Sequence, residues 1–204
     1  MDLISAFGLL HSRVHAGEVY DRPSLADRVF GDLTDDQMRA RPATGVNSLV
    51  WLLWHMARTE DSAVNHVVAA TAQVLDDQWA RRMNVPARAI GTGMTDDEVV
   101  EITRRADVAA VRAYRVAVGR RTRDVVRSLR PEQWDVIQTD DDIARAAAEG
   151  AYGSNRAAFR AFARHPYVGL SHGTQLFVSG ADHNARHIGE AITIRGLGGF
   201  GLAM

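Results

Sequence analysis

The feature that most constrains the fold is a long apolar stripe between residues 49 and 75. Apolar side chains recur there at spacings of three and four residues, as on one face of an α-helix: Leu49, Leu52, Leu53, Met56, Ala63, Val64 and Val67. Asn47 or Ser48 can cap the start of this helix. A helix from Leu49 to about Leu75 spans about 40 Å at 1.5 Å per residue. That is the length of a helix in a bundle.

Other segments predict further helices joined by loops. One is expected over residues 3–31, interrupted near Pro23, where Ser24 can cap a short second piece. A near capping box at residues 34–37 opens a short helix. A long amphipathic helix is expected over residues 95–129 and the last helix over residues 173–195. No stretch alternates like a series of strands, so the chain is predicted to be all-α, with a four-helix bundle as the simplest architecture.

The segment from residue 132 to residue 167 has a weaker pattern. It predicts short helices over residues 140–149 and 155–164, inserted before the last bundle helix and packed on the outside. The glycine-rich tail from residue 196 is expected to be loosely held. A chain of 204 residues fits one domain, residues 1–204, better than two.

Composition excludes several classes of protein. Hydrophobic residues make up 46% of the chain and charged residues 24%, and the formal net charge is -1, so no bulk attraction to nucleic acid or anionic membranes is expected. The basic cluster Arg120, Arg121 and Arg123 is interpreted as a solvated helix face, because Asp124 follows it. No apolar run approaches the roughly 20 residues of a membrane span, and the N-terminus is a poor signal peptide. A cytoplasmic protein is therefore expected.

The chain contains no cysteine. This removes disulfides, thiolate nucleophiles and cysteine-ligated metals. Any metal ion must therefore be held by nitrogen and oxygen ligands.

His183 and His187 lie four residues apart on the last predicted helix. Side chains at that spacing share one helix face, and both imidazoles can reach one ion about 2.0–2.1 Å away. No Glu follows the first His directly, so this is not the zinc-protease motif. Ser179, Gly180 and Glu190 fall on the same stripe. Small and polar residues on an inward face indicate a cavity or a ligand, because buried polar groups need partners.

His55 is the third candidate ligand. It lies in the most apolar stretch of the chain, Trp51-Leu52-Leu53-Trp54-His55-Met56, and is expected to be at least partly buried. Considered alone, it is explained better as a core histidine with one hydrogen bond. Together with His183 and His187 it predicts a three-histidine site between two bundle helices. Glu60 lies about 140° off the face of His55 at 100° per residue and is not assigned as a ligand. Glu190 is a candidate acceptor for an imidazole N–H.

The other five histidines are not expected to bind this ion: His11, His15, His66, His165 and His172. The first two are also four residues apart, but they lie on a mostly polar N-terminal stretch and are expected at the surface. The third is about 16 Å from His55 along the helix, which is too far to share an ion. His165 falls in a predicted loop. His172 is expected near the mouth of the site.

The segment Asn47–Asp61, together with His183-x-x-x-His187-Ile188-Gly189-Glu190, resembles the DinB-like superfamily. The lead-in from Leu33 to Pro42 is similar to the first connection of that family. The resemblance implies a four-helix bundle that is often dimeric. It also implies a divalent metal held by one His on the second helix and by the pair on the last helix, here His55, His183 and His187. Residues 132–167 have no clear counterpart in the family pattern, and they could carry substrate specificity or be scaffold.

The resemblance implies a function only in outline. Relatives include S-transferases and isomerases that use low-molecular-weight thiols such as mycothiol or bacillithiol, among them mycothiol-dependent maleylpyruvate isomerase, and many others have no known activity. The expectation is a metal-dependent transferase or isomerase acting on a small molecule, with a thiol as a cofactor and a homodimeric assembly. Zinc or nickel is favoured and iron is possible, because three histidines suit zinc, nickel, iron or copper. No catalytic or thiol-binding side chain is assigned.

Two alternatives remain open at this point. One is a non-catalytic stress-related or ligand-binding protein in which the metal is structural. The other is a hydrolase using metal-bound hydroxide, which needs a general base that the sequence does not identify. An open coordination position with a pocket above it favours an enzyme, whereas four protein ligands in a closed site favour a structural metal.

Overall fold

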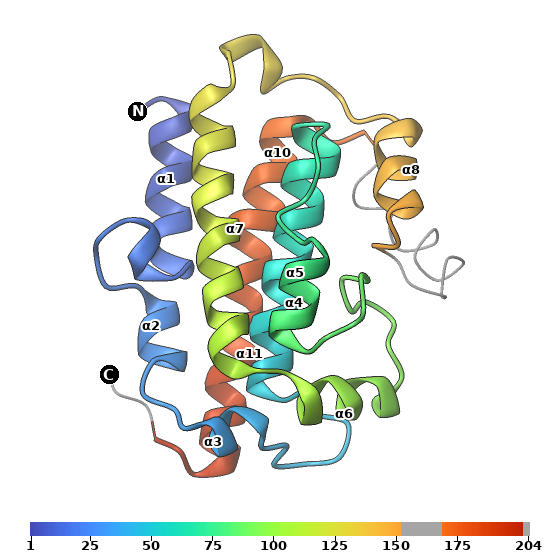
Figure 1. The fold of residues 1–204 in the computed structure, drawn as a ribbon. Coiled ribbons are helices and arrows are strands. Elements are labelled where there is room, and N and C mark those ends of the chain that lie inside the picture. Colours follow the sequence, from blue (N-terminus) through green and yellow to red (C-terminus); the bar gives the residue numbers. More distant parts are fainter. Residues whose placement is uncertain (152–168, 202–204) are drawn as a thin grey trace.

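The computed structural model describes residues 1–151 and 169–201. Its long helices lie side by side as a bundle (Figure 1). These are α1 (Leu3–Val14), α4 (Leu49–Asp61), α7 (Val108–Ser128) and α11 (His183–Gly198). No strand occurs in the described residues, where the only β-type pairing is an isolated bridge between Ile137 and Ser171. The prediction of an all-α fold is confirmed.

Shorter elements connect the bundle helices. They are η1 (Gly17–Val19), α2 (Leu25–Phe30), α3 (Asp35–Arg39), α5 (Asp77–Met83), α6 (Asp96–Arg105), η3 (Pro131–Gln133) and α8 (Asp140–Ala148). Side-chain caps fix where several helices begin. Ser24 and Thr34 form capping boxes at α2 and α3, and Ser48 accepts from the backbone N–H of Trp51 at the start of α4. The caps predicted at these three positions are confirmed.

Two of the long bundle helices contain a π-helical segment that the sequence did not predict. The α4 helix continues as η2 (Ser62–Val68), and the last helix runs from α10 (His172–Leu176) through η4 (Phe177–Asp182) into α11. The predicted helix from Leu49 therefore ends near residue 68 rather than 75. Beyond it the chain turns back, because the Asp61 carboxylate accepts hydrogen bonds from the backbone N–H groups of Val74 and Leu75 at 2.8 and 2.9 Å.

The single amphipathic helix predicted over residues 95–129 is in fact two helices. The α6 helix ends at Arg105 and α7 begins at Val108. Asp107 lies between them in an extended conformation and caps α7 by accepting from the backbone N–H of Ala110 at 2.8 Å. An Asp side chain competes with the helical backbone for hydrogen bonds, so it favours a cap over a helix interior.

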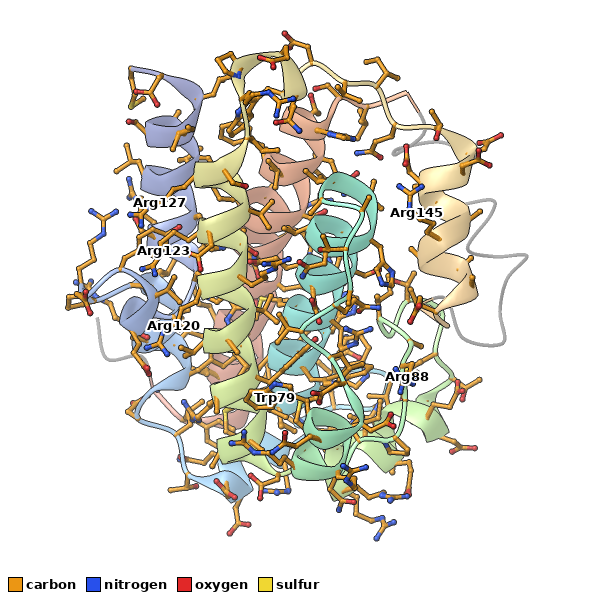
Figure 2. The ribbon with its side chains drawn as sticks, turned by 45° about the horizontal axis from the view of Figure 1, so that its top comes forward. Trp79, Arg88, Arg120, Arg123, Arg127 and Arg145 are labelled. Carbon is orange, nitrogen blue, oxygen red and sulfur yellow. The ribbon has the colours of Figure 1, made fainter. Side chains whose placement is uncertain are left out.

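The arginine cluster on α7 does more than face solvent. Arg120, Arg123 and Arg127 follow one another along α7 on the side of α1 (Figure 2). Arg120 pairs with Glu18 at 2.6 Å, and Arg123 donates to the carbonyl of Val19 at 2.6 Å. These contacts attach η1 to α7, so Arg120 and Arg123 help to hold the connection between α1 and α2 in place.

The inserted α8 helix lies outside the bundle, beside η2 (Figure 1). Its side chains Ile143 and Ala146 pack with Ile90, whose N–H donates to the carbonyl of Ala151 at 2.7 Å. The helix predicted over residues 155–164 and His165 lie outside the described residues. The tail predicted to be loosely held from residue 196 begins as the end of α11, which continues to Gly198. The following turn is held by Arg195, which donates to the carbonyls of Phe200 and Gly201.

The main core lies between α4, α7 and α11. Its largest fully buried members include Trp54, Leu52 and Met56 on α4 and Tyr114 on α7, and Ile188 of α11 packs against them. None of the helices in the described ranges is long and apolar enough to cross a membrane.

Asp61 is expected to be essential for this fold. It is fully buried and accepts hydrogen bonds from Arg58, Asn65, Tyr114 and the two backbone groups named above. Asp61→Ala removes one partner of a buried ion pair and should lower the free energy of unfolding by about 3–5 kcal/mol. Chemical denaturation measures this change.

Asp77→Ala is the control, because Asp77 pairs with Arg88 on the surface, where both side chains are largely exposed. This variant should stay within about 1 kcal/mol of the wild type. Equal effects of the two substitutions would contradict the role assigned to Asp61.

Candidate metal centre

The structure brings together the three histidines that the sequence singled out. His55 projects from α4, and His183 and His187 project from the first turns of α11. One ring nitrogen from each lies within 4.8 Å of the others. The ring centroids of His55 lie 5.0 Å from that of His183 and 4.8 Å from that of His187. Two helices more than a hundred residues apart in the sequence thus meet at one candidate metal centre.

His55 is oriented by its surroundings. Its Nδ1–H donates to the carbonyl oxygen of Ile90, which leaves the Nε2 lone pair available. The Trp51 ring stacks on the imidazole at a centroid distance of 4.8 Å. Gly91 brings the backbone close with φ at +99°, and a Cβ there would lie 3.1 Å from His55 Nδ1 and 2.9 Å from the Trp54 ring. The turn at residues 90–91 therefore requires glycine to reach this histidine.

His187 is oriented in the same way by a carboxylate. Its Nδ1 donates to Glu190 Oε2 at 2.8 Å, and Asn47 donates to the other oxygen of Glu190 at 3.0 Å. Burial would raise the pKa of Glu190, but the hydrogen bonds from His187 and Asn47 outweigh it and hold that pKa below its usual value. The Nε2 of His187 is thus presented to the centre. The role suggested by the sequence for Glu190 agrees with this geometry.

The spacing of the two α11 histidines fits a bound ion. The Nε2 atoms of His183 and His187 lie 3.2 Å apart. Two nitrogens that each bind a tetrahedral ion at 2.0–2.1 Å lie roughly 3.3 Å from one another. His183 has less support than the others, since its buried Nδ1 has no hydrogen-bond partner among the described residues. The donor set nevertheless matches an all-nitrogen metal site.

Burial keeps the imidazoles of His55 and His183 neutral. Removal from water, together with nearby His187, lowers the pKa of His55 to about 4. Removal from water, together with the two neighbouring histidines, also lowers the pKa of His183. A neutral imidazole has a lone pair that can bind a cation, so neither of these two rings has to lose a proton before it binds one at pH 7.

A cavity of about 420 Å³ adjoins the three histidines, all of which line it. Polar side chains on its wall include Thr59, Gln175 and Ser179. Gly93 and Arg186 also line it and are exposed, so the cavity reaches the surface. Ile143 of α8 contributes to the wall, which places the inserted segment at the site. His172, expected at the mouth, does not line this cavity.

The prediction that His11 and His15 lie at the surface is wrong. Both side chains are fully buried, and with Glu60 they form a second group of three ligand-type residues. The α1 helix belongs to the bundle, and its sequence, LISAFGLLHSRV, is mostly apolar rather than polar. Gly119 on α7 makes room for His15, because a Cβ there would lie 2.4 Å from its ring, and Gly180 makes room for the neighbouring Phe7, whose ring would lie 2.9 Å from such a Cβ. Glu60 belongs to this second group and not to the first.

Comparison with known proteins identifies the family. A family model described as the DinB superfamily matches residues 18–191. No curated protein matches the chain. Among solved structures, the chain is similar to a conserved protein from Enterococcus faecalis, with 18% sequence identity and a TM-score of 0.62 over 96% of this chain and 94% of that one. That likeness concerns the fold alone. The family match extends over most of the chain, which therefore belongs to the DinB superfamily.

Proposed function

We propose that this protein is a metal-dependent enzyme that holds one divalent ion through His55, His183 and His187. Its reaction is the transfer of a low-molecular-weight thiol to a small molecule, or a thiol-assisted isomerisation. The observation that carries the proposal is the position of the three imidazoles on the wall of an open cavity of about 420 Å³. Such a cavity has the size of a small-molecule site.

The protein supplies the binding and orientation for this chemistry. When bound, a divalent ion held by three neutral ligands lowers the pKa of a thiol or water molecule and polarises a carbonyl. Ile90 and Glu190 fix the ring orientations of His55 and His187, so that their Nε2 atoms converge. The chain contains no cysteine, so the thiol must come from solution and enter through the cavity.

A purely structural metal is less well supported. Among residues 1–151 and 169–201, the group contains three histidines and no fourth ligand. The nearest carboxylate on α11, Glu190, is occupied by hydrogen bonds from His187 and Asn47. A structural site is typically closed by four protein ligands, whereas a catalytic site keeps one position for water or substrate. Zinc or nickel remains the favoured ion, and a homodimer remains part of the proposal.

The ligand assignment can be tested by elemental analysis of the purified protein. The wild type should carry about one equivalent of zinc or nickel per chain, and His55→Ala and His183→Ala should each lose most of it. His66→Ala is the control, because His66 is also a buried histidine following α4 but lies outside the group. It should keep its metal. Unchanged metal content in both ligand variants would refute the site.

The use of a thiol can be tested on the cobalt-loaded protein. Titration with a small thiol such as 2-mercaptoethanol should produce a thiolate-to-cobalt charge-transfer band if a coordination position is open. Ile143→Trp should fill part of the cavity and weaken thiol affinity about tenfold, or about 1.4 kcal/mol, without loss of cobalt.

The matched control for this experiment is Ile137→Trp, because Ile137 is exposed and does not line the cavity. Its thiol affinity should equal that of the wild type. Absence of any charge-transfer band in the cobalt-loaded wild type would argue against a thiol-using enzyme and for a closed, structural metal.

A further inference from the structure

The group formed by His11, His15 and Glu60 lies in the interior of the bundle and has no part in the proposed chemistry. All three side chains are fully buried. The Nε2 of His11 lies 2.9 Å from Glu60 Oε1, and the Nε2 of His15 lies 3.7 Å from Glu60 Oε2. Two imidazoles and a carboxylate are metal-ligand types, so a second ion site has to be considered first.

The hydrogen bonds argue against a metal at this group. The Nδ1 of His15 accepts from the backbone N–H of Ala16 at 2.8 Å, so the neutral ring carries its proton on Nε2, which faces Glu60. That nitrogen has no lone pair to give. His11 bridges Glu60 and the hydroxyl of Tyr20, which lies 2.7 Å from its Nδ1. His11 is therefore a hydrogen-bond partner of the Glu60 carboxylate, whereas the Nε2 of His15 faces that carboxylate at 3.7 Å and has no hydrogen-bond partner among the described residues.

Glu60 is the centre of this network and connects all four bundle helices. Its carboxylate accepts hydrogen bonds from His11 of α1, from the hydroxyl of Thr122 of α7 at 2.7 Å, and from the side-chain amide of Asn184 of α11 at 2.9 Å. Burial alone would raise the pKa of Glu60, but the attraction and hydrogen bond of His11, together with the charge of Arg115, outweigh it and hold that pKa below its usual value. A buried carboxylate that accepts several hydrogen bonds holds the side chains that donate to it in one arrangement.

Asn184 connects the hydrogen-bond network of Glu60 to the metal centre. It directly follows His183, and its side-chain amide also donates to the carbonyl of Gly180 at 2.8 Å. Gly180 belongs to η4, the π-helical segment that ends immediately before His183. A π-helical turn contains more residues than an α-helical turn, so it changes the direction in which the following side chains project. Asn184 thus bonds both the π-helical backbone and the carboxylate that α4 provides.

We propose that Asn184, held by Glu60, is a positioning residue for the metal centre. It fixes the π-helical register of the last helix and thereby sets where His183 and His187 project relative to His55. The inference rests on the proposed metal site. Residues that orient metal ligands without touching the ion typically contribute 10–100-fold to metal affinity.

The test compares Asn184→Ala with Thr122→Val, because each removes one fully buried hydrogen bond to the same carboxylate. Only the first changes the ligand helix. Thermal unfolding measures the structural loss, which should be larger in Asn184→Ala, because Asn184 also donates to Gly180 and accepts from Arg115. Zinc affinity, measured by competition with a chromophoric chelator, should fall about 10–100-fold in Asn184→Ala and stay within about twofold of the wild type in Thr122→Val. The visible spectrum of bound cobalt should change only in Asn184→Ala.

Two results would overturn the positioning role. One is unchanged zinc affinity and an unchanged cobalt spectrum in Asn184→Ala. The other is an equal loss of affinity in both variants, which would reflect general destabilisation. If Asn184→Ala does not fold, Asn184→Ser replaces it in the same comparison, because a serine hydroxyl can still bond the carbonyl four residues earlier.

The two proposals fail in different ways. A wild-type protein that binds neither zinc nor cobalt would overturn the metal site and this inference with it. A wild type that binds metal, with loss in His183→Ala but none in Asn184→Ala, would leave the metal site standing and remove only the role of Asn184.

Discussion

Two adjacent carboxylates on α4, Glu60 and Asp61, are both fully buried, and much of the structure is arranged around them. A buried carboxylate is costly unless it is paired and hydrogen-bonded. Glu60 obtains its donors from α1, α7 and α11, whereas Asp61 obtains them from Arg58, Tyr114 and the backbone at residues 74–75. The helices must therefore approach α4 from several sides at the same level. Packing of apolar side chains alone would permit many more arrangements of the bundle.

The candidate metal centre depends on this arrangement. His55 lies five residues before Glu60 on α4, and His183 lies one residue before Asn184 on α11. The Glu60–Asn184 hydrogen bond thus joins the two ligand helices next to the point where their histidines converge. Each ligand helix also carries a π-helical segment near this level, η2 after α4 and η4 before α11. Segments of this kind are frequent at functional sites, where they redirect a few side chains without ending the helix.

The chemistry of the centre follows from what surrounds the imidazoles. The Ile90 carbonyl accepts a hydrogen bond from Nδ1–H of His55, and Glu190 accepts one from Nδ1–H of His187. Burial keeps the rings of His55 and His183 neutral. The inserted α8 helix adds Ile143 to the cavity wall. The segment that precedes the last bundle helix therefore lines the cavity beside the three histidines.

The sequence by itself determined the helical class, several helix starts and the identity of the three convergent histidines. Local features suffice for these, because the apolar period, the caps at Ser24, Thr34 and Ser48 and the i, i+4 spacing of His183 and His187 act within a few residues. His55 needed the family resemblance as well. Only the tertiary structure decided the burial of His11, His15 and Glu60 and the π-helical segments, neither of which has a local signal. Whether a polar side chain is buried depends on donors contributed by other helices, here Thr122 and Asn184, which lie 62 and 124 residues from Glu60.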